Sequence, residues 1–417
     1  MTETVAYRVY GYRWVVLGIF AVLNAIVQMN WIAFAAVTGD ASDFYQVSVL
    51  SIGFLSMIYM IVFIIVSIPA SYVIDTYGIR IGVGVGAALT GVFALMRGVV
   101  ADDYTLVVIA TIGLAIGQPF ILNAITKVAA QWFAVTERAT ADAIPSLFQF
   151  VGIIAAMAVT PYLVSSLGIA GMLRVYGVVS VAVGLAAVLL MRERPPTQPS
   201  ASDGVERFAV FAGLRYIFRQ RNMLILLVLF FVGLGMFNAI STWIEQLVAP
   251  RGFDSEQAGL IGAAMLVAGI IGAAVMSLWS DHSRRRKPFL ILALVGMVPG
   301  LVGLGFATNF AVLVASSFVF GFFLMSAYPV GMQYGAEVSY PAPESTSQGI
   351  IILAGQAAGI LFIFGMDAFR VGADDSMSAS MVVFIVLTLV TIGLTTFMGE
   401  SPMIIAARDK DSPKELR

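Results

Sequence analysis

The chain is dominated by long apolar runs that are almost free of charge, and these runs constrain its fold more than any other feature. The first extends from Trp14 to Val37, and similar runs follow along the sequence. Crossing the hydrocarbon core of a bilayer takes roughly 20 residues of helix. Backbone groups in lipid need internal partners, and uninterrupted apolar runs meet that need as helices rather than as alternating barrel strands. The sequence therefore predicts an all-α membrane protein.

Composition agrees with this fold class. Of 417 residues, 60% are hydrophobic and 11% are charged, and the mean hydropathy is +0.95. Soluble proteins keep about a quarter of their residues charged, so most of this surface must face the lipid bilayer. We expect about twelve transmembrane helices. They cover residues 14–37, 49–73, 79–100, 105–127, 140–164, 171–191, 223–247, 257–279, 288–307, 310–333, 346–368 and 378–399.

Residue types that bind metals or nucleic acid are scarce. There are no cysteines, and the one histidine, His282, lies in a charged segment, so a thiolate or histidine metal site is not expected. The formal net charge of -1 provides no basic field for nucleic acid. We expect no cofactor and no nucleic-acid partner, and the spans contain no constellation typical of an enzyme.

Basic residues predict the orientation in the membrane. With a cytoplasmic N-terminus, all but four of the 23 Lys and Arg residues fall on the inner side. Such a bias marks cytoplasmic loops, so both termini are predicted to be cytoplasmic. No organelle-targeting signal is recognisable, and we expect a monomer in the plasma membrane. The four exceptions are Arg97, Arg174, Arg251 and Arg370.

A polar stretch in the middle divides the chain into two halves. Residues 1–191 hold six spans, 192–222 form a cytoplasmic linker, 223–400 hold six more spans, and 401–417 form a cytoplasmic tail. After a Pro-rich start, the linker is predicted to contain a short helix on the membrane surface. Its apolar and basic residues are Phe208, Phe211, Leu214, Phe218, Arg207, Arg215 and Arg219.

Identical residues recur in the two halves at a nearly constant offset. The pairs, 206 or 207 residues apart, are Gly53 and Gly259, Ser71 and Ser277, Asp75 and Asp281, Glu137 and Glu344, Gln149 and Gln356, and Gly152 and Gly359. Together they predict two six-helix repeats of parallel topology. That is the arrangement of the major facilitator fold, in which solutes bind near the midplane between the halves.

Charged motifs occur at matching places in the two halves. The run Ser71-x-x-x-Asp75-x-x-Gly78-x-Arg80 resembles the G-x-x-x-D-x-x-G-x-R signature of the major facilitators, with Ser in place of the first Gly. A carboxylate at a helix end can bind a neighbouring helix N-terminus or an arginine. We expect an inner gate here, the alternative being an ordinary charged turn. Its residues are Asp75, Arg80, Asp281 and Arg284.

Polar side chains within the spans are mostly neutral, and such groups usually face the bundle interior. Those expected to line a solute chamber are Trp31, Gln118, Asn238, Gln356, Tyr59, Tyr328 and Glu245. Glu245 is the one carboxylate clearly within a predicted span, toward its outer end, and it serves either an outer gate or the solute. Gln149 and Asn24 are assigned to hydrogen bonds between helices. A chamber of amides and aromatic rings suits an uncharged molecule or a cation held by ring faces.

Longer motifs permit a narrower comparison. They include Leu55-Ser56-Met57-Ile58-Tyr59-Met60, Gln118-Pro119-Phe120-Ile121-Leu122, Gln131-Trp132-Phe133, Ala239-Ile240-Ser241-Thr242 and Glu337-Val338-Ser339-Tyr340-Pro341. With these the chain resembles the feline leukaemia virus subgroup C receptor-related branch of the major facilitators, over nearly all its spans. That family comprises choline and ethanolamine facilitators, earlier described as haem exporters.

The resemblance implies a substrate site. In that family a Trp of the first span and a Gln of the fourth enclose the quaternary ammonium, and these positions fall on Trp31 and Gln118. A Gln of the eleventh span corresponds to Gln356. A Tyr of the seventh falls on Asn238, a departure that removes one aromatic wall. Haem is disfavoured, because no histidine is available in the spans as an axial ligand.

These patterns predict a secondary transporter that carries a small polar or cationic organic solute by alternating access. A choline-like or ethanolamine-like solute and a facilitative mechanism are expected. The alternative within the superfamily is a proton-coupled exporter or an organic-anion or metabolite permease. A receptor or scaffold without transport would require larger extramembrane domains than the short outer loops provide.

Overall fold

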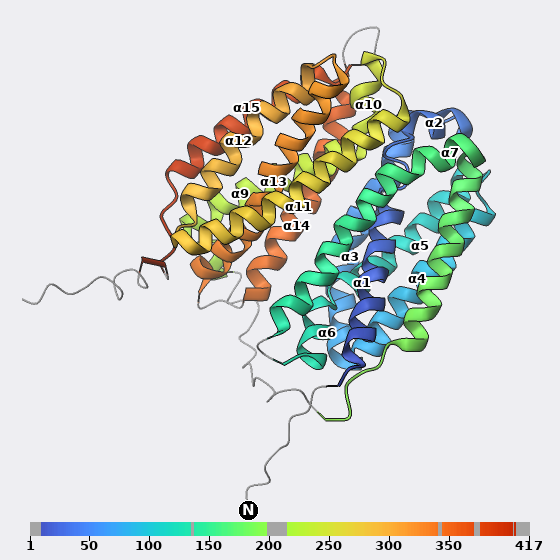
Figure 1. The fold of residues 1–417 in the computed structure, drawn as a ribbon, viewed down its shortest axis with the longest axis horizontal. Helices are drawn as coiled ribbons and strands as arrows, with labels where there is room; N and C mark the ends of the chain where they lie inside the picture. Colours follow the sequence, from blue (N-terminus) through green and yellow to red (C-terminus); the bar gives the residue numbers. More distant parts are fainter. Residues whose placement is uncertain are drawn as a thin grey trace, which may run out of the picture. The chain divides into compact units, whose positions relative to one another are not determined.

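The structure, a computed structural model, describes residues 10–134, 137–197, 215–340, 344–370, 376–402 and 404–405, with the backbone alone at 139 and 344–346. The chain divides into two compact units, Met1–Gly204 and Val205–Arg417. Each unit is a bundle of long helices (Figure 1). Most of the residues proposed for the linker helix, Phe208 included, lie outside the described residues, whereas Phe218 is described and exposed.

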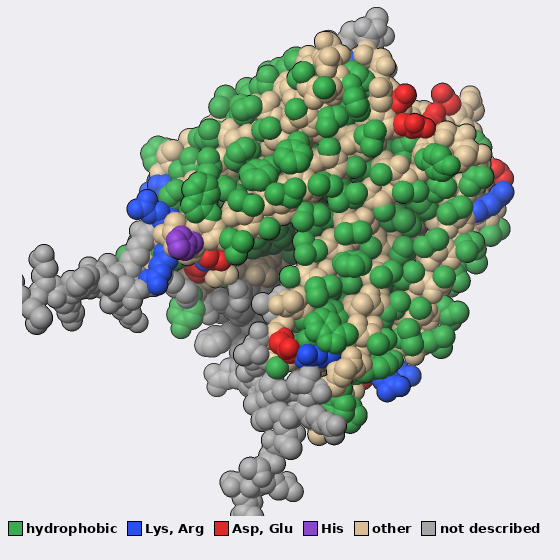
Figure 2. Space-filling view, in the orientation of Figure 1, with side chains coloured by type: hydrophobic (Ala, Val, Ile, Leu, Met, Phe, Trp, Pro, Cys, Tyr) green, Lys and Arg blue, Asp and Glu red, His purple; other side chains and the backbone are tan. Residues whose placement is uncertain are grey.

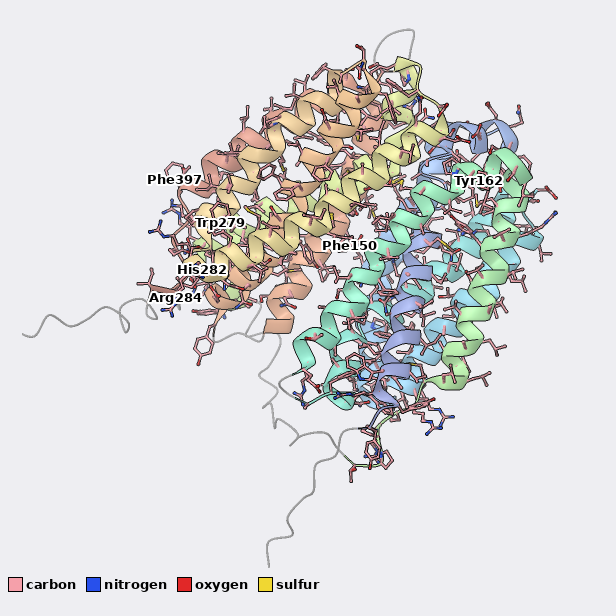
Figure 3. The ribbon with its side chains drawn as sticks, in the orientation of Figure 1. Phe150, Tyr162, Trp279, His282, Arg284 and Phe397 are labelled. Atoms are coloured by element: carbon pink, nitrogen blue, oxygen red, sulfur yellow. The ribbon has the colours of Figure 1, made fainter. Side chains whose placement is uncertain are left out.

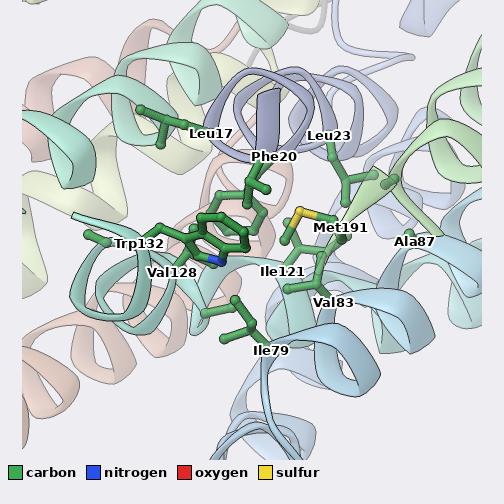
Figure 4. Close-up of a cluster of buried hydrophobic side chains, with 14 of the residues drawn as sticks. Leu17, Phe20, Leu23, Ile79, Val83, Ala87, Ile121, Val128, Trp132 and Met191 are labelled. Atoms are coloured by element: carbon green, nitrogen blue, oxygen red, sulfur yellow. The ribbon is translucent and has the colours of Figure 1, made fainter. Parts of the chain in front are cut away.

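Unit 1 contains seven helices in its described part. They are α1 (Arg13–Trp31), α2 (Thr38–Tyr45), α3 (Val49–Tyr77), α4 (Ile79–Val99), α5 (Tyr104–Leu122), α6 (Ile125–Trp132) and α7 (Arg138–Leu190). The core at one end of the bundle joins side chains of several helices, among them Phe20, Ile121 and Trp132 (Figure 4). Burial of these large apolar groups fixes how the helices pack around α1.

Helix α7 covers two of the predicted spans, 140–164 and 171–191. At 53 residues a straight helix would be about 80 Å long, far beyond a bilayer core of roughly 30 Å. Gly168 interrupts it with φ 72° and ψ 175°, a conformation that glycine adopts readily. The Thr160 and Tyr176 hydroxyls, 2.6 Å apart, show that α7 folds back on itself. Its first part packs on α1 and its second on α4 (Figure 1).

Unit 2 repeats this packing scheme. Its described elements are α9 (Arg221–Thr242), α10 (Ile244–Val248), the 3-10 helix η2 (Ala249–Arg251), α11 (Ser255–Ser283), α12 (Lys287–Phe306), α13 (Phe310–Ser339), α14 (Glu344–Ala368) and α15 (Ser378–Thr396). Helix α9 packs on α14 as α1 packs on α7, and α11 on α13 as α3 on α5. Helix α12 packs on α15 as α4 packs on the second part of α7. Two units with the same helix pairing agree with a duplicated six-helix bundle.

Three predicted spans end earlier than their hydropathy indicated, and one of them is 105–127, where α5 ends at Leu122 and α6 follows. Helix α1 ends at Trp31, and residues 32–37, predicted as helix, form turns before α2. Likewise α9 ends at Thr242, and α10 follows as a separate short helix. The apolar residues Ile32 to Val37 are buried in the unit, so their hydropathy reports protein burial instead of continued helix. A hydropathy pattern cannot distinguish these two environments.

The helices have the dimensions and surface of membrane spans. Eleven described helices are long and apolar enough to cross a membrane, and Thr140–Leu190 is counted once although it folds back. On each unit, hydrophobic side chains cover the visible face and charged groups lie near helix ends (Figure 2). Exposed side chains such as Ile68 and Leu278 are more than 70% accessible. Apolar exposure on this scale is tolerated in lipid and not in water, so this is a multi-pass membrane protein.

Candidate functional site

The candidate site of unit 1 is built on one face of α1. Gln28 and Trp31 are three residues apart and therefore neighbours on the helix surface. Gln118 of α5 donates its Nε2–H to Gln28 Oε1 at 3.1 Å. Trp31 is 7% exposed, and its indole N–H has no partner among the described residues. Gln28 thus hydrogen-bonds to Gln118 and is a helix-surface neighbour of Trp31.

The amide contacts continue from Gln28 into the bundle. Gln28 Nε2 donates to Gln149 Oε1 of α7 at 3.4 Å, and Gln149 Nε2 donates to Asn24 Oδ1 at 3.5 Å. Asn24 Nδ2 donates to the Phe20 carbonyl at 2.9 Å. The interhelical role expected for Gln149 and Asn24 is therefore present in the geometry. These contacts also connect both residues to the Gln118 side chain.

Tyr59 of α3 lies beside a buried cation. Its side chain is buried, and its hydroxyl lies near the Arg97 guanidinium without a hydrogen bond of normal geometry. Arg97 of α4 is 1% exposed and donates to the backbone oxygen and to Oδ1 of Asn30, at 3.3 and 2.6 Å. Its guanidinium also stands 5.8 Å from the Phe34 ring centre. Unit 1 therefore buries a cationic side chain inside a predicted span, although the spans were expected to be almost free of charge.

The candidate site of unit 2 lies where α9 contacts α14. Asn238 is buried and donates its Nδ2–H to the Gly355 carbonyl at 3.4 Å. Gln356, the next residue of α14, is partly exposed, and its side chain makes no hydrogen bond within the described residues. Ser241 and Thr242 follow Asn238 on the same helical face, and their buried hydroxyls lack described partners. Asn238 and Gln356 therefore belong to one polar region of unit 2.

Two further candidates of unit 2 lie elsewhere. Tyr328 of α13 is 38% exposed, and its ring packs against Phe230 with centres 6.0 Å apart. Glu245 was expected inside the seventh span, but it lies in α10 beyond the end of α9. It is buried and accepts a hydrogen bond from Ser255 Oγ at 3.3 Å. Since Ser255 begins α11, Glu245 links α10 to the next helix.

The gate residues of unit 1 are mostly exposed. The Asp75 carboxylate lies 3.4 Å from Lys127 Nζ, which also donates to the Ile74 carbonyl. The Arg80 side chain is exposed, while its backbone N–H donates to Glu193 Oε2 at 2.8 Å. Glu193 thus caps the start of α4, where the helix dipole favours a negative charge.

In unit 2 the equivalent carboxylate binds a buried arginine. Arg286 contacts Asp281 Oδ1 at 2.5 Å and Glu337 Oε1 at 3.1 Å. Burial lowers the pKa of Arg286, but its hydrogen bonds to Asp281 and Glu337 outweigh this effect and raise the pKa above its ordinary value. Arg284, the expected gate residue, is the C-cap of α11 with φ 50°. His282 and Arg284 both lie at this end of α11 (Figure 3).

Arg286 is not singled out by the local motif, but the repeat offset could have found it. It lies 206 residues after Arg80, the last residue of the first motif. Its backbone N–H donates to Glu400 Oε1 at 3.0 Å, as that of Arg80 donates to Glu193. Glu400 in turn follows Glu193 by 207 residues. Both units therefore cap their equivalent helices, α4 and α12, with repeat-related carboxylates.

Two repeated bundles of apolar helices, with charged contacts at helix ends and amide groups inside, define a polytopic membrane transporter architecture. A family model described as Major Facilitator Superfamily matches residues 17–363, and the chain belongs to this superfamily. The structure is similar to that of a bacterial homolog of the human lysosomal transporter Spinster, with a TM-score of 0.76 and 15% identity, covering 96% of this chain and 98% of that one. A D-xylose-proton symporter gives a TM-score of 0.71 at 15% identity, covering 94% and 99%.

Sequence relatives are solute carriers. Solute carrier family 49 member A3 of Xenopus tropicalis is 32% identical over 375 residues, covering 86% of this chain and 78% of that protein. Choline/ethanolamine transporter FLVCR1 of Mus musculus is 28% identical over 383 residues, covering 84% and 68%. The human choline/ethanolamine transporter FLVCR2 is 25% identical over 371 residues, covering 84% and 70%. The predicted resemblance is confirmed, and the chain is a transporter and not an enzyme.

Proposed function

We propose that this transporter carries a small polar or cationic organic solute, of the choline or ethanolamine type, by facilitated alternating access. The observation that carries the proposal is the cluster of Trp31, Gln28 and Gln118 in unit 1, which offers an indole and neutral amides. An aromatic face attracts a cation by its quadrupole. Neutral amides can hydrogen-bond a hydroxyl group of the solute without taking up a proton. The similarity to named choline/ethanolamine transporters supports the same solute class.

In unit 2, Asn238 and Gln356 are proposed as further solute-binding residues. Asn238 and Gln356 provide amides, and Ser241 and Thr242 provide hydroxyls that lack described partners. Buried polar groups without partners are costly, so a solute that bonds them recovers part of that cost. Tyr328 and Glu245 are proposed as accessory residues of unit 2, and Tyr59 as one of unit 1.

The inner gate is proposed to open by release of the helix-end contacts, made by Asp75 and Lys127 in unit 1 and by Asp281 and Arg286 in unit 2. Arg80 and Arg284 are proposed to join them, because the motif places them at the same helix ends. The protein is proposed to act as a monomer in the plasma membrane with both termini cytoplasmic. The basic residues of the predicted inner loops support that orientation.

Uptake of radiolabelled choline and ethanolamine into proteoliposomes tests the proposal. Trp31→Ala and Gln356→Ala should each lower uptake at least tenfold, a loss equivalent to about 1.4 kcal/mol. Trp279→Ala is a matched control, since Trp279 is an exposed residue of α11 that packs against Phe289 (Figure 3). Absence of uptake of both amines by the wild-type protein would refute the solute assignment.

The alternative is a proton-coupled exporter or an anion or metabolite permease. One observation favours it: Asp142 of α7 has a carboxylate oxygen that is buried without a described partner, and such a group can carry a proton. Transport should be measured with and without a pH gradient, for the wild type and for Asp142→Asn. Facilitated transport predicts equal rates under both conditions, whereas a rate that follows the gradient and is lost in Asp142→Asn favours coupling.

A further inference from the structure

The amide side chains of unit 1 form a chain with a single possible direction. A backbone carbonyl can only accept a hydrogen bond, so Asn24 must turn its Nδ2 toward the Phe20 oxygen, 2.9 Å away. Its Oδ1 then faces Gln149, which must donate through Nε2. The same reasoning applies at each following contact, because two amides meeting at one point need one donor and one acceptor.

The direction set at Phe20 reaches Gln118. Gln149 turns its nitrogen toward Asn24, so its Oε1 faces Gln28, which donates to it at 3.4 Å. Gln28 then offers Oε1 to Gln118, which donates at 3.1 Å. Reversing Gln118 would place two carbonyl oxygens or two amide nitrogens face to face somewhere along the chain. Aligned amides also polarise one another, which strengthens the common direction.

The far end of this chain is an acceptor. The Oε1 atom of Gln118 makes no hydrogen bond within the described residues, and it is not among the fully buried polar atoms that lack a partner. It is therefore open to a bound molecule. Trp31 is near this end, since it lies one turn from Gln28 on the same face of α1. A solute there meets a carbonyl oxygen and an indole ring, both of which attract positive charge.

We infer that Asn24, Gln149 and Gln28 are positioning residues that hold Gln118 with its carbonyl oxygen toward the solute. The site of unit 1 then accepts ammonium groups and other hydrogen-bond donors and rejects carboxylates, although no protein carboxylate enforces that choice. This inference rests on the proposed function in one respect, that the solute contacts Gln118. It also explains how neutral amides can favour a positively charged solute over a negatively charged one.

The test compares ligand preference in the wild type and three variants of the purified full-length protein. Binding is measured by thermal shift in nanodiscs, with ethanolamine, choline and tetramethylammonium against the carboxylates acetate and glycolate. Gln28→Leu removes the acceptor that orients Gln118, so the amide can turn and the ammonium preference should fall at least tenfold. Gln28→Asn keeps a neutral donor and acceptor at this position and should retain more of the preference than Gln28→Leu does.

This pair separates positioning from packing. If Gln28 merely fills space, the near-isosteric Leu should retain the preference better than the smaller Asn, and that result would overturn the inference. Stronger binding of carboxylates than of ammonium compounds by the wild type would overturn it as well. Gln149→Leu is the third variant, expected to weaken the preference less than Gln28→Leu, because Gln118 keeps its direct partner. Loss of choline and ethanolamine uptake alone, with the ammonium preference intact for other amines, would refute the proposed solute and leave the chain of amides standing.

Discussion

The closest helix contact next to the amide chain provides the sharpest test of the packing. A Cβ built on Gly152 of α7 would lie 2.0 Å from the Ala25 oxygen of α1, whereas real Cβ atoms stay beyond 3.0 Å. Gly152→Ala must therefore move α1 and α7 apart by about 1 Å at this point, because the obstructing atom belongs to the backbone. Overpacking of this kind costs roughly 1–3 kcal/mol.

Gly84→Ala is the matched control. Gly84 lies within α4, and a Cβ there would have nothing within 4 Å, so the change should gain up to about 1 kcal/mol of helix propensity. With each unit near the size of a domain, 1 kcal/mol corresponds to roughly 2–4 °C in Tm. We expect thermal unfolding in detergent to place Gly152→Ala on the order of 5 °C below Gly84→Ala.

The same displacement should act on ligand choice. Gly152 lies one turn from Gln149, and Ala25 is adjacent to Asn24, whose contact with Gln149 is already 3.5 Å long. A shift of about 1 Å breaks that contact, so Gly152→Ala should also reduce the ammonium preference. A Gly152→Ala protein as stable as Gly84→Ala would refute the packing argument, since the two helices could not then be in backbone contact.

Two further comparisons test the charged groups, each by thermal unfolding. Glu337→Gln should cost about 1.5–3 kcal/mol, because it removes the buried one of the two carboxylates that bind Arg286, while Asp281 remains. Asp75→Asn should cost at most about 1 kcal/mol, because the Asp75 carboxylate is 60% exposed; equal losses in these two variants would contradict the difference in burial. Asn30→Leu should destabilise the protein more than Arg97→Met does. The reason is that Asn30→Leu leaves the buried Arg97 guanidinium without its side-chain acceptor. The reverse order of stability would contradict the assignment of Asn30 as the partner of Arg97.

The sequence by itself determined the helical membrane fold, the number of crossings and the duplication. Hydropathy and repeat offset are properties of the chain read in order, and the bilayer converts apolar length directly into helix. The family motifs predicted that Trp31 and Gln118 belong to one solute site. The relation of Arg286 to Arg80 was also present in the offset of 206 residues, although the local motif pointed to Arg284.

Only the tertiary structure decided where α1 and α9 end, which arginine binds Asp281, and in which direction the amides point. The apolar residues after Trp31 are buried by neighbouring helices, a circumstance that hydropathy does not register. The direction of Gln118 depends on the Phe20 carbonyl at the other end of the chain of contacts. Such hydrogen bonds join groups on different helices, so their partners follow from helix rotation and crossing, which no local pattern of residues encodes.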